Sequence, residues 1–224
     1  MKILSLLDKP VRPREIMEAI EEDRKTISAR QMVAGSKNKA LRECWQAAAF
    51  GIGYETFAQP CKITVLSGTR PLDFQLVTGD KCLPFETVMI LQEDRKMGDE
   101  YREIEAIVAS GKTYIKHISE EDISNNEKNL PNRICKAIEK KSFKYDPSVN
   151  LCIYLNIFAP AVNIEEIRET CKGLENSFES IWLLSGNHIA TLFISPKSSL
   201  IKIDVFGEHD ANAIPELEEE INPM

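Results

Sequence analysis

Two carboxylates in the first half of the chain are the residues whose types and spacing suit catalysis. Asp73 opens a predicted strand, and Glu86 lies within a second predicted strand thirteen positions later, beyond a predicted turn. Carboxylates on neighbouring strands repel each other and lose hydration, so a bound divalent cation is the main reason to keep them together. Their oxygen atoms suit Mg²⁺ or Mn²⁺, and such a site supports metal-assisted hydrolysis of phosphodiester bonds.

The elements that must position these carboxylates alternate between helices and strands. Helical patterns predict helices over residues 10–31, 40–50, 98–110, 131–145 and 164–174. Apolar runs bounded by turn residues predict strands over residues 61–66, 73–77, 83–91, 150–158, 178–185, 189–194 and 200–206. This order is typical of an α/β protein with a mixed β-sheet flanked by helices.

The composition is that of a globular protein with an acidic C-terminal tail. The 224 residues include 28 Lys and Arg against 35 Asp and Glu, a net charge of −7, and 43% are hydrophobic. No run reaches the roughly 18 apolar residues that a membrane-spanning helix needs. We expect an N-terminal helical segment over residues 1–36, an α/β domain over 37–206 and a solvated acidic tail over 207–224.

The arrangement around the carboxylates resembles the core of the PD-(D/E)XK nucleases. The resembling features are a helix with Glu43, an Asp-led strand, a hairpin to a strand with a central Glu86, and then a helix and a strand. The resemblance covers about residues 38–158. It implies a restriction-endonuclease-like core in which Asp73 and Glu86 bind metal and take part in catalysis, with Glu43 as an outer metal ligand. The family carries a lysine two residues after this Glu, where this chain has Val88.

Some members of that family place the lysine on a nearby helix, and the predicted helix over residues 131–145 offers a candidate. Helical periodicity puts Ile134, Ile138 and Tyr145 on the buried face of this helix, and Lys141 lies toward the same face. A lysine in that position either reaches a carboxylate or extends its amine past the apolar surface. We therefore predict Lys141 as the displaced catalytic lysine.

A nucleic-acid substrate would require a local basic patch, because the chain as a whole is acidic. The predicted nucleic-acid contacts are Arg95, Lys96, Arg133, Lys136, Lys140 and Lys144. The last four share a narrow arc of the helix over residues 131–145, and the first two follow the strand of Glu86. A solvated helix face is the simpler interpretation of the same stripe.

Two functions follow from these residues. The first is a metal-dependent nuclease that hydrolyses nucleic-acid phosphodiester bonds with Mg²⁺ or Mn²⁺. The second is a catalytically inactive nuclease-fold protein that acts as a protein-interaction module or oligomeric subunit, for example a homodimer; Val88 and the net acidity favour it. Simpler interpretations are that Asp73 is a turn residue after Pro71 and that Glu43 pairs with Lys39.

The cysteines and the start of the chain predict a cytoplasmic protein without membrane contact. The six cysteines are Cys44, Cys61, Cys82, Cys135, Cys152 and Cys171. They form no CxxC pair, which argues against a zinc site of the usual spacing, and the first ten residues do not have the pattern of a signal peptide. We expect reduced cysteines in the core.

Overall fold

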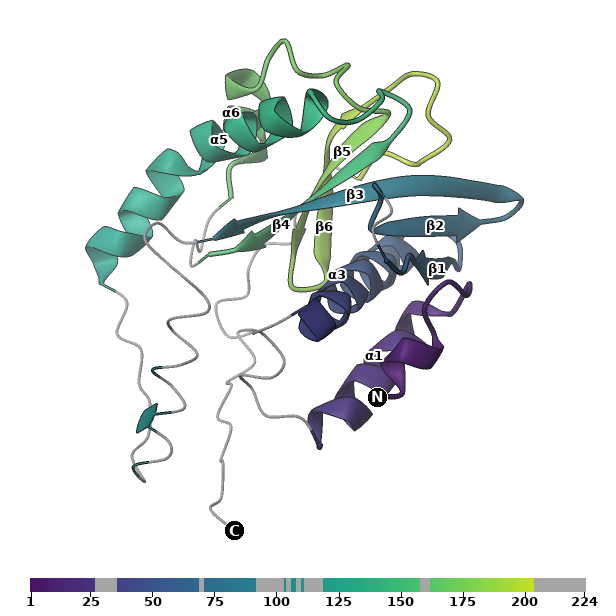
Figure 1. Cartoon of the computed structure of the whole chain (residues 1–224). Helices are drawn as coiled ribbons and strands as arrows, with labels where there is room; N and C mark the ends of the chain where they lie inside the picture. The colour runs from purple at the N-terminus through teal and green to yellow at the C-terminus, as the bar shows by residue number, and fades with distance from the viewer. Residues whose placement is uncertain are drawn as a thin grey trace.

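A six-stranded mixed β-sheet forms the centre of the molecule, with helices on both faces (Figure 1). The computed structural model describes residues 1–26, 36–68, 71–91, 119–157 and 162–203, together with residues 103, 106, 107 and 110. The predicted α/β class with a mixed, helix-flanked sheet is confirmed. The predicted tail over residues 207–224, and most of the predicted helix over 98–110, lie outside the described residues.

The strands follow one another across the sheet in chain order. They are β1 (Lys62–Val65), β2 (Phe74–Thr78), β3 (Lys81–Leu91), β4 (Asn150–Asn156), β5 (Ser180–Ser185) and β6 (His188–Ile194). The first three form an antiparallel meander, β3, β4 and β5 are parallel, and β6 is antiparallel to β5. The helices are η1 (Ile3–Ser5, a 3-10 helix), α1 (Pro13–Arg24), α3 (Ser36–Phe57), α5 (Glu120–Ser142) and α6 (Ile164–Thr170).

Each face of the sheet has its own apolar core. On one face α3 packs against the strands and α1 packs against α3, which buries Phe50 together with Trp182 of β5. On the other face lie α5 and α6, where Ile134 and Ile138 are fully buried against the sheet. The N-terminal segment belongs to the first core, because Ile3 is completely buried in it.

Helix α3 continues past Gly51 and Gly53, where the sequence predicts its end, and finishes at Phe57. A Cβ atom on Gly51 would lie 2.6 Å from Cγ of Pro13 in α1. A Cβ atom on Gly53 would lie 2.4 Å from the backbone oxygen of Asn187 in the turn before β6. These two glycines therefore allow neighbouring segments to approach the helix closely, and they do not terminate it.

Helix α5 begins at Glu120, eleven residues before the predicted start at Pro131. Ser119 caps it, because the Ser119 hydroxyl accepts a hydrogen bond from the backbone N–H of Asp122 at 3.0 Å and the Asp122 carboxylate accepts one in return from the Ser119 backbone. This capping box satisfies N–H groups that the first turn of a helix leaves unpaired. The polar, Asn-rich segment over residues 120–130 is therefore helical, and Pro131 lies inside the helix.

Short segments cover both edges of the sheet. The backbone of Val11 exchanges two hydrogen bonds with Ile63 of β1, at 2.8 and 2.9 Å. At the other edge, the backbone N–H of Thr191 in β6 donates to the carbonyl of Ile203 at 2.8 Å, and the N–H of Ile203 donates to the Thr191 hydroxyl at 2.9 Å. The described part of the predicted strand over 200–206 is thus an irregular segment that occupies a strand's position.

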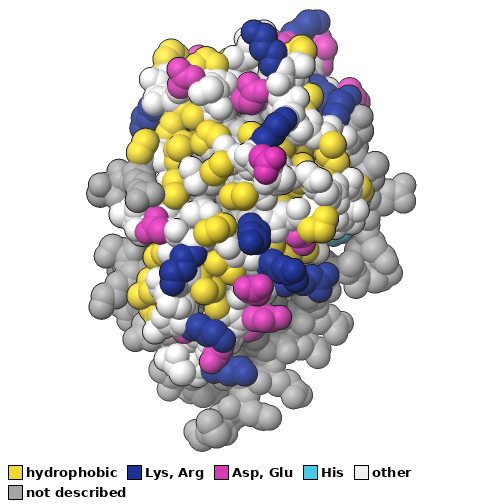
Figure 2. Space-filling view, turned by 90° about the vertical axis from the view of Figure 1, so that its right-hand side faces the viewer, with side chains coloured by type: hydrophobic (Ala, Val, Ile, Leu, Met, Phe, Trp, Pro, Cys, Tyr) yellow, Lys and Arg dark blue, Asp and Glu magenta, His cyan; other side chains and the backbone are white. Residues whose placement is uncertain are grey.

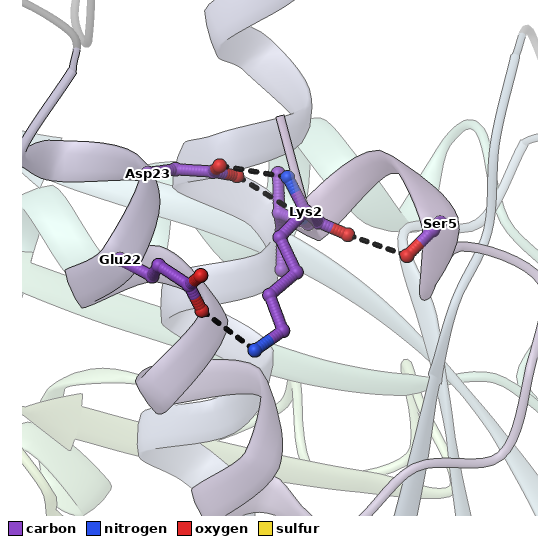
Figure 3. A network of polar contacts seen from close by, with 5 residues as sticks. Lys2, Ser5, Glu22 and Asp23 are labelled. Carbon is purple, nitrogen blue, oxygen red and sulfur yellow. Dashed lines mark hydrogen bonds and ion pairs between the residues drawn. The ribbon is translucent and has the colours of Figure 1, made fainter.

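A buried carboxylate holds the N-terminus against α1 (Figure 3). Asp23, 6% exposed, accepts hydrogen bonds from the backbone N–H groups of Lys2 and Ile3 at 2.7 and 2.8 Å. The Lys2 ammonium pairs with Glu22 at 2.6 Å, and the Ser5 hydroxyl donates to the Lys2 carbonyl. Asp23 therefore does for η1 what a capping residue does for a longer helix.

Candidate functional site

The β2–β3 hairpin brings Asp73 and Glu86 side by side. The register pairs Phe74 with Phe85, so Asp73 and Glu86 occupy the next pair of opposed positions. The backbone N–H of Asp73 donates to the carbonyl of Phe85 at 3.1 Å, which extends the ladder by one bond. The juxtaposition of two carboxylates on neighbouring strands is therefore present in the structure.

Asp73 is bonded to donors of its own hairpin. Its Oδ2 atom accepts a hydrogen bond from the backbone N–H of Thr87 at 2.8 Å and another from the Thr87 hydroxyl. Hydrogen bonds from a backbone amide and a hydroxyl stabilise a carboxylate in its charged form without a cation. The interpretation of Asp73 as a residue that organises the chain at a strand start accounts for this geometry.

Glu86 is buried, and its charge is compensated by α5. It is 5% exposed, and its Oε1 atom forms an ion pair with the Lys141 ammonium. Tyr145 lies close enough to influence the same carboxylate, and the Lys141 ammonium lies 5.5 Å from the centre of the Tyr145 ring. Burial raises the pKa of the Glu86 carboxyl and Asp73 raises it further, whereas Lys141 and Tyr145 oppose the rise.

Lys141 supplies a positive charge to Glu86, one of the two carboxylates. The prediction that Lys141 faces inward is confirmed, because its side chain reaches Glu86 from α5. A lysine already bonded to Glu86, with Thr87 bonded to Asp73, supplies the positive charge and the donors that a metal ion would supply. Among the described residues no group of three His, Cys, Asp or Glu side chains is placed to hold a metal. Both carboxylates are thus bonded to donors of the chain itself, and the Mg²⁺ or Mn²⁺ cofactor stays a prediction.

Glu43 lies on α3, the helix on the opposite face of the sheet from α5. Its side chain is half-buried, and its charge is felt by the neighbouring Cys44, whose pKa is raised to about 12 by burial and, to a smaller extent, by Glu43. The structure therefore places Glu43 and Lys141 on different sides of the sheet. The side chain of Lys39, its predicted partner, lies outside the described residues.

The predicted basic stripe runs along the second half of α5 and into the turn that follows the helix. Lys136, Lys140 and Lys144 are exposed, and Arg133 is half-buried. The Nη1 atom of Arg133 is buried and has no hydrogen-bond partner among the residues that the structure describes. Arg95 and Lys96 lie outside the described residues.

Several basic residues elsewhere on the surface are paired with acids, whereas Lys62, Lys81 and Lys197 are exposed and, like the lysines of this stripe, form no ion pair in the described structure. Lys2 pairs with Glu22 at 2.6 Å, Arg24 with Glu21 at 3.1 Å, and Lys172 with Glu169 at 3.3 Å. On the side of the molecule seen in Figure 2, basic and acidic side chains lie close together among hydrophobic ones. Within the described part of the chain, the ammonium groups of Lys136, Lys140 and Lys144 form no ion pair.

The cysteines are not all reduced, contrary to the prediction. Cys135 of α5 and Cys171, directly after α6, form a disulfide. Cys44, Cys61 and Cys152 are free and buried, and burial raises the pKa of the Cys61 thiol to about 12, so these thiols are unreactive core residues. Nothing in the spacing of Cys135 and Cys171 identifies the pair.

Comparisons with known proteins give no support to a nuclease. No family model matches the chain, and no curated protein matches it. The chain is similar to the solved structure of a Pseudomonas aeruginosa protein of unknown function, assigned to the monooxygenase superfamily, with 15% identity and a TM-score of 0.42. The match covers 83% of this chain and 86% of that one.

The resemblance to the PD-(D/E)XK nucleases is therefore corrected. Neither a family model nor a curated protein identifies the chain as a nuclease, and Lys141 and Thr87 bond to the carboxylates that were expected to bind metal. The predictions of a restriction-endonuclease-like core and of a Mg²⁺-dependent nuclease are wrong, and so is that of an inactive nuclease-fold protein. No described helix is long and apolar enough to cross a membrane. The cytoplasmic location and the homodimer stay predictions.

Proposed function

We propose that the protein is a non-catalytic nucleic-acid-binding protein whose contact surface is the outer face of α5. The observation that carries this proposal is the set of three exposed lysines, Lys136, Lys140 and Lys144, without an ion pair in the described structure. Lys136 and Lys140 are four residues apart in α5 and project from one side of it, with about 6 Å of rise between them, and Lys144 follows in the turn after the helix. They can therefore contact successive phosphates of one backbone.

The charge of the stripe is not cancelled within α5. Glu139 is the only acid in the segment over residues 131–145, whereas the acids of this helix are concentrated at its start, in Glu120, Glu121 and Asp122. Acids at the start and bases at the end favour the helix dipole, which explains part of the pattern. That effect is confined to the last turn and does not account for Lys136, which lies six residues before the helix ends.

The Lys141–Glu86 pair has a supporting role in this proposal. It links the side of α5 that faces the sheet to β3. Lys136, Lys140 and Lys144 are exposed to solvent. Six acids of the net-acidic chain belong to the segment over residues 207–224, so the domain itself is close to neutral. A local basic face on a near-neutral domain is enough for backbone binding that weakens with salt.

The test measures binding of a labelled oligonucleotide of about 20 nucleotides by fluorescence anisotropy over a range of salt concentrations. The variant Lys136→Ala/Lys140→Ala/Lys144→Ala removes three charges and keeps helix propensity. We expect the slope of log K against log salt to become shallower by roughly 2 to 3 and the affinity to fall.

The matched control changes three exposed lysines outside α5, in Lys62→Ala/Lys81→Ala/Lys197→Ala. It alters the net charge equally and is expected to leave the slope almost unchanged. Equal slopes for the two triple variants, or no binding by the natural protein, would refute the proposal.

A further inference from the structure

Phe143 is the most exposed large hydrophobic side chain in the described structure. It is 82% exposed, whereas Met1, Leu4, Phe57 and Ile201 are between 39% and 47% exposed. It is the residue at the C-terminal cap of α5 and has helical backbone angles, with φ −70° and ψ −12°. Packing within the described chain does not explain a phenylalanine in this position.

Phe143 directly follows α5 and is close in sequence to the exposed lysines. It follows Lys140 by three residues and Lys136 by seven, and residues at these spacings lie one above another on a helix. Lys144 is the next residue and is also exposed. The outer face of α5 therefore combines positive charge with one projecting aromatic ring.

This combination fits an unpaired nucleotide better than a duplex. Proteins that bind single strands hold the backbone with basic side chains and stack bases on aromatic rings. In a duplex the flat faces of the bases are covered by their neighbours, so an exposed ring gains little. A lipid surface fits less well, because an interfacial helix needs a broad apolar face, and Phe143 is the only exposed large hydrophobic residue that α5 and its cap present in the described structure.

We infer that the outer face of α5 selects single-stranded nucleic acid, with Lys136, Lys140 and Lys144 on phosphates and Phe143 stacked on a base. The inference rests on the proposed function and specifies its substrate class. It separates two contributions: the lysines determine the salt dependence of binding, and the ring determines the preference for unpaired bases.

The experiment compares the single strand with a duplex of the same sequence for the natural protein and for Phe143→Ala. We expect Phe143→Ala to weaken single-strand binding by roughly 5- to 150-fold, the range for one stacked base, with duplex affinity and the salt slope unchanged. Phe143→Trp should retain single-strand affinity, and its fluorescence should change when the strand binds. The control Phe57→Ala removes an exposed ring at the far end of α3 and should bind like the natural protein.

The outcomes separate this inference from the proposed function. If Phe143→Ala binds the single strand normally while the lysine variant does not, the stacking role is refuted and backbone binding remains. If it loses single-strand and duplex affinity equally, selection of unpaired bases is refuted. If vesicles containing phosphatidylserine bind in a Phe143-dependent way and nucleic acid does not bind, both ideas fail and the face contacts lipid. Circular dichroism of each variant verifies that the fold is intact.

Discussion

On the α1–α3 face of the sheet, Phe50 meets Phe74, Phe85 and Trp182 with ring centres 4.9 to 5.7 Å apart. The buried core of the α5–α6 face is mostly aliphatic, with Phe178, and this face also contains the Lys141–Glu86 ion pair and the Cys135–Cys171 disulfide. The first face is stabilised by dense apolar packing around a long helix. The second face depends more on two specific ties, Lys141–Glu86 and Cys135–Cys171. The helix that presents the proposed binding surface thus belongs to the face with these two links.

Helices α3 and α5 differ in the substitutions that they can accept. In α3, a side chain at Gly51 or Gly53 would meet atoms of neighbouring segments at less than 3 Å. In α5, Ile134 and Ile138 are buried while Lys136, Lys140 and Phe143 are exposed, so the sequence of the outer face is free of packing constraints. A function located on α5 can therefore be changed without rebuilding the core.

The largest expected effect is on the aromatic face. Phe50→Ala should lower the free energy of unfolding by about 4 to 5 kcal/mol, because a fully buried ring that contacts several others leaves a cavity. Urea unfolding followed by circular dichroism measures it. The matched change Phe143→Ala should cost less than about 0.5 kcal/mol, since that ring is exposed. Similar losses for the two variants would contradict the description of either site.

Removal of the Cys135–Cys171 disulfide should have a smaller effect on stability. Replacing Cys135 and Cys171 with alanine should lower the free energy of unfolding by about 3 to 4 kcal/mol, the chain-entropy value for a separation of 36 residues. Hydrogen exchange should show faster opening of α5 and α6, with α1 and α3 nearly unchanged. Uniform acceleration over both faces would argue against independent attachment of the helices. The natural protein with its disulfide reduced is the control, and it should behave like the alanine variant.

Of these three features, the Lys141–Glu86 ion pair should contribute least to the free energy of unfolding. Lys141→Met leaves Glu86 buried without its counter-ion, at an expected cost of about 2 to 3 kcal/mol, since the Lys141 side chain is 23% exposed. The double variant Lys141→Met/Glu86→Gln removes both charges and should recover most of the loss. A double variant that is as unstable as Lys141→Met would mean that the charge on Glu86 is not the cause.

The pH dependence of the free energy of unfolding is a second test of the Lys141–Glu86 pair. The pKa of Glu86 is raised in the folded protein, mainly by burial, so the folded state binds this proton more tightly than the unfolded chain. The resulting stabilisation is complete below the ordinary carboxyl pKa and is lost as the pH rises through the raised value. Lys141→Met should raise that pKa further. Its destabilisation should therefore be smaller near about pH 4 than near about pH 7, changing by at most about 1.4 kcal/mol per pH unit.

Periodicity and local composition predicted much of the site's geometry. The Gly-containing turn between two apolar runs predicted the β2–β3 hairpin, and that hairpin places Asp73 opposite Glu86. A 3.6-residue repeat separated the inward Lys141 from the outward Lys140 and Lys144. These features depend on interactions between residues close in sequence, which explains why a single sequence is sufficient to predict them.

Features that depend on distant contacts were not predictable in the same way. The sequence predicts that this helix ends at residue 50, before Gly51, because Pro13 and Asn187, the close neighbours of the two glycines of α3, are remote in sequence. The disulfide joins cysteines that no spacing rule connects. The chemistry assigned to the carboxylates was wrong for a related reason: two acids alone suggest a metal, whereas the donors that satisfy them come from Thr87 and from a helix 55 residues away from Glu86.

The covered edge strands of the sheet affect how copies of this protein associate at high concentration. Val11 and Ile203 already use backbone groups of Ile63 and Thr191 that an incoming strand from another copy would need. Fibre growth by strand addition is thereby disfavoured at both margins. Conditions that detach the first eleven residues or the segment around Ile203 would expose the unpaired backbone groups of β1 or β6. We therefore expect ordered aggregation to start with such a detachment.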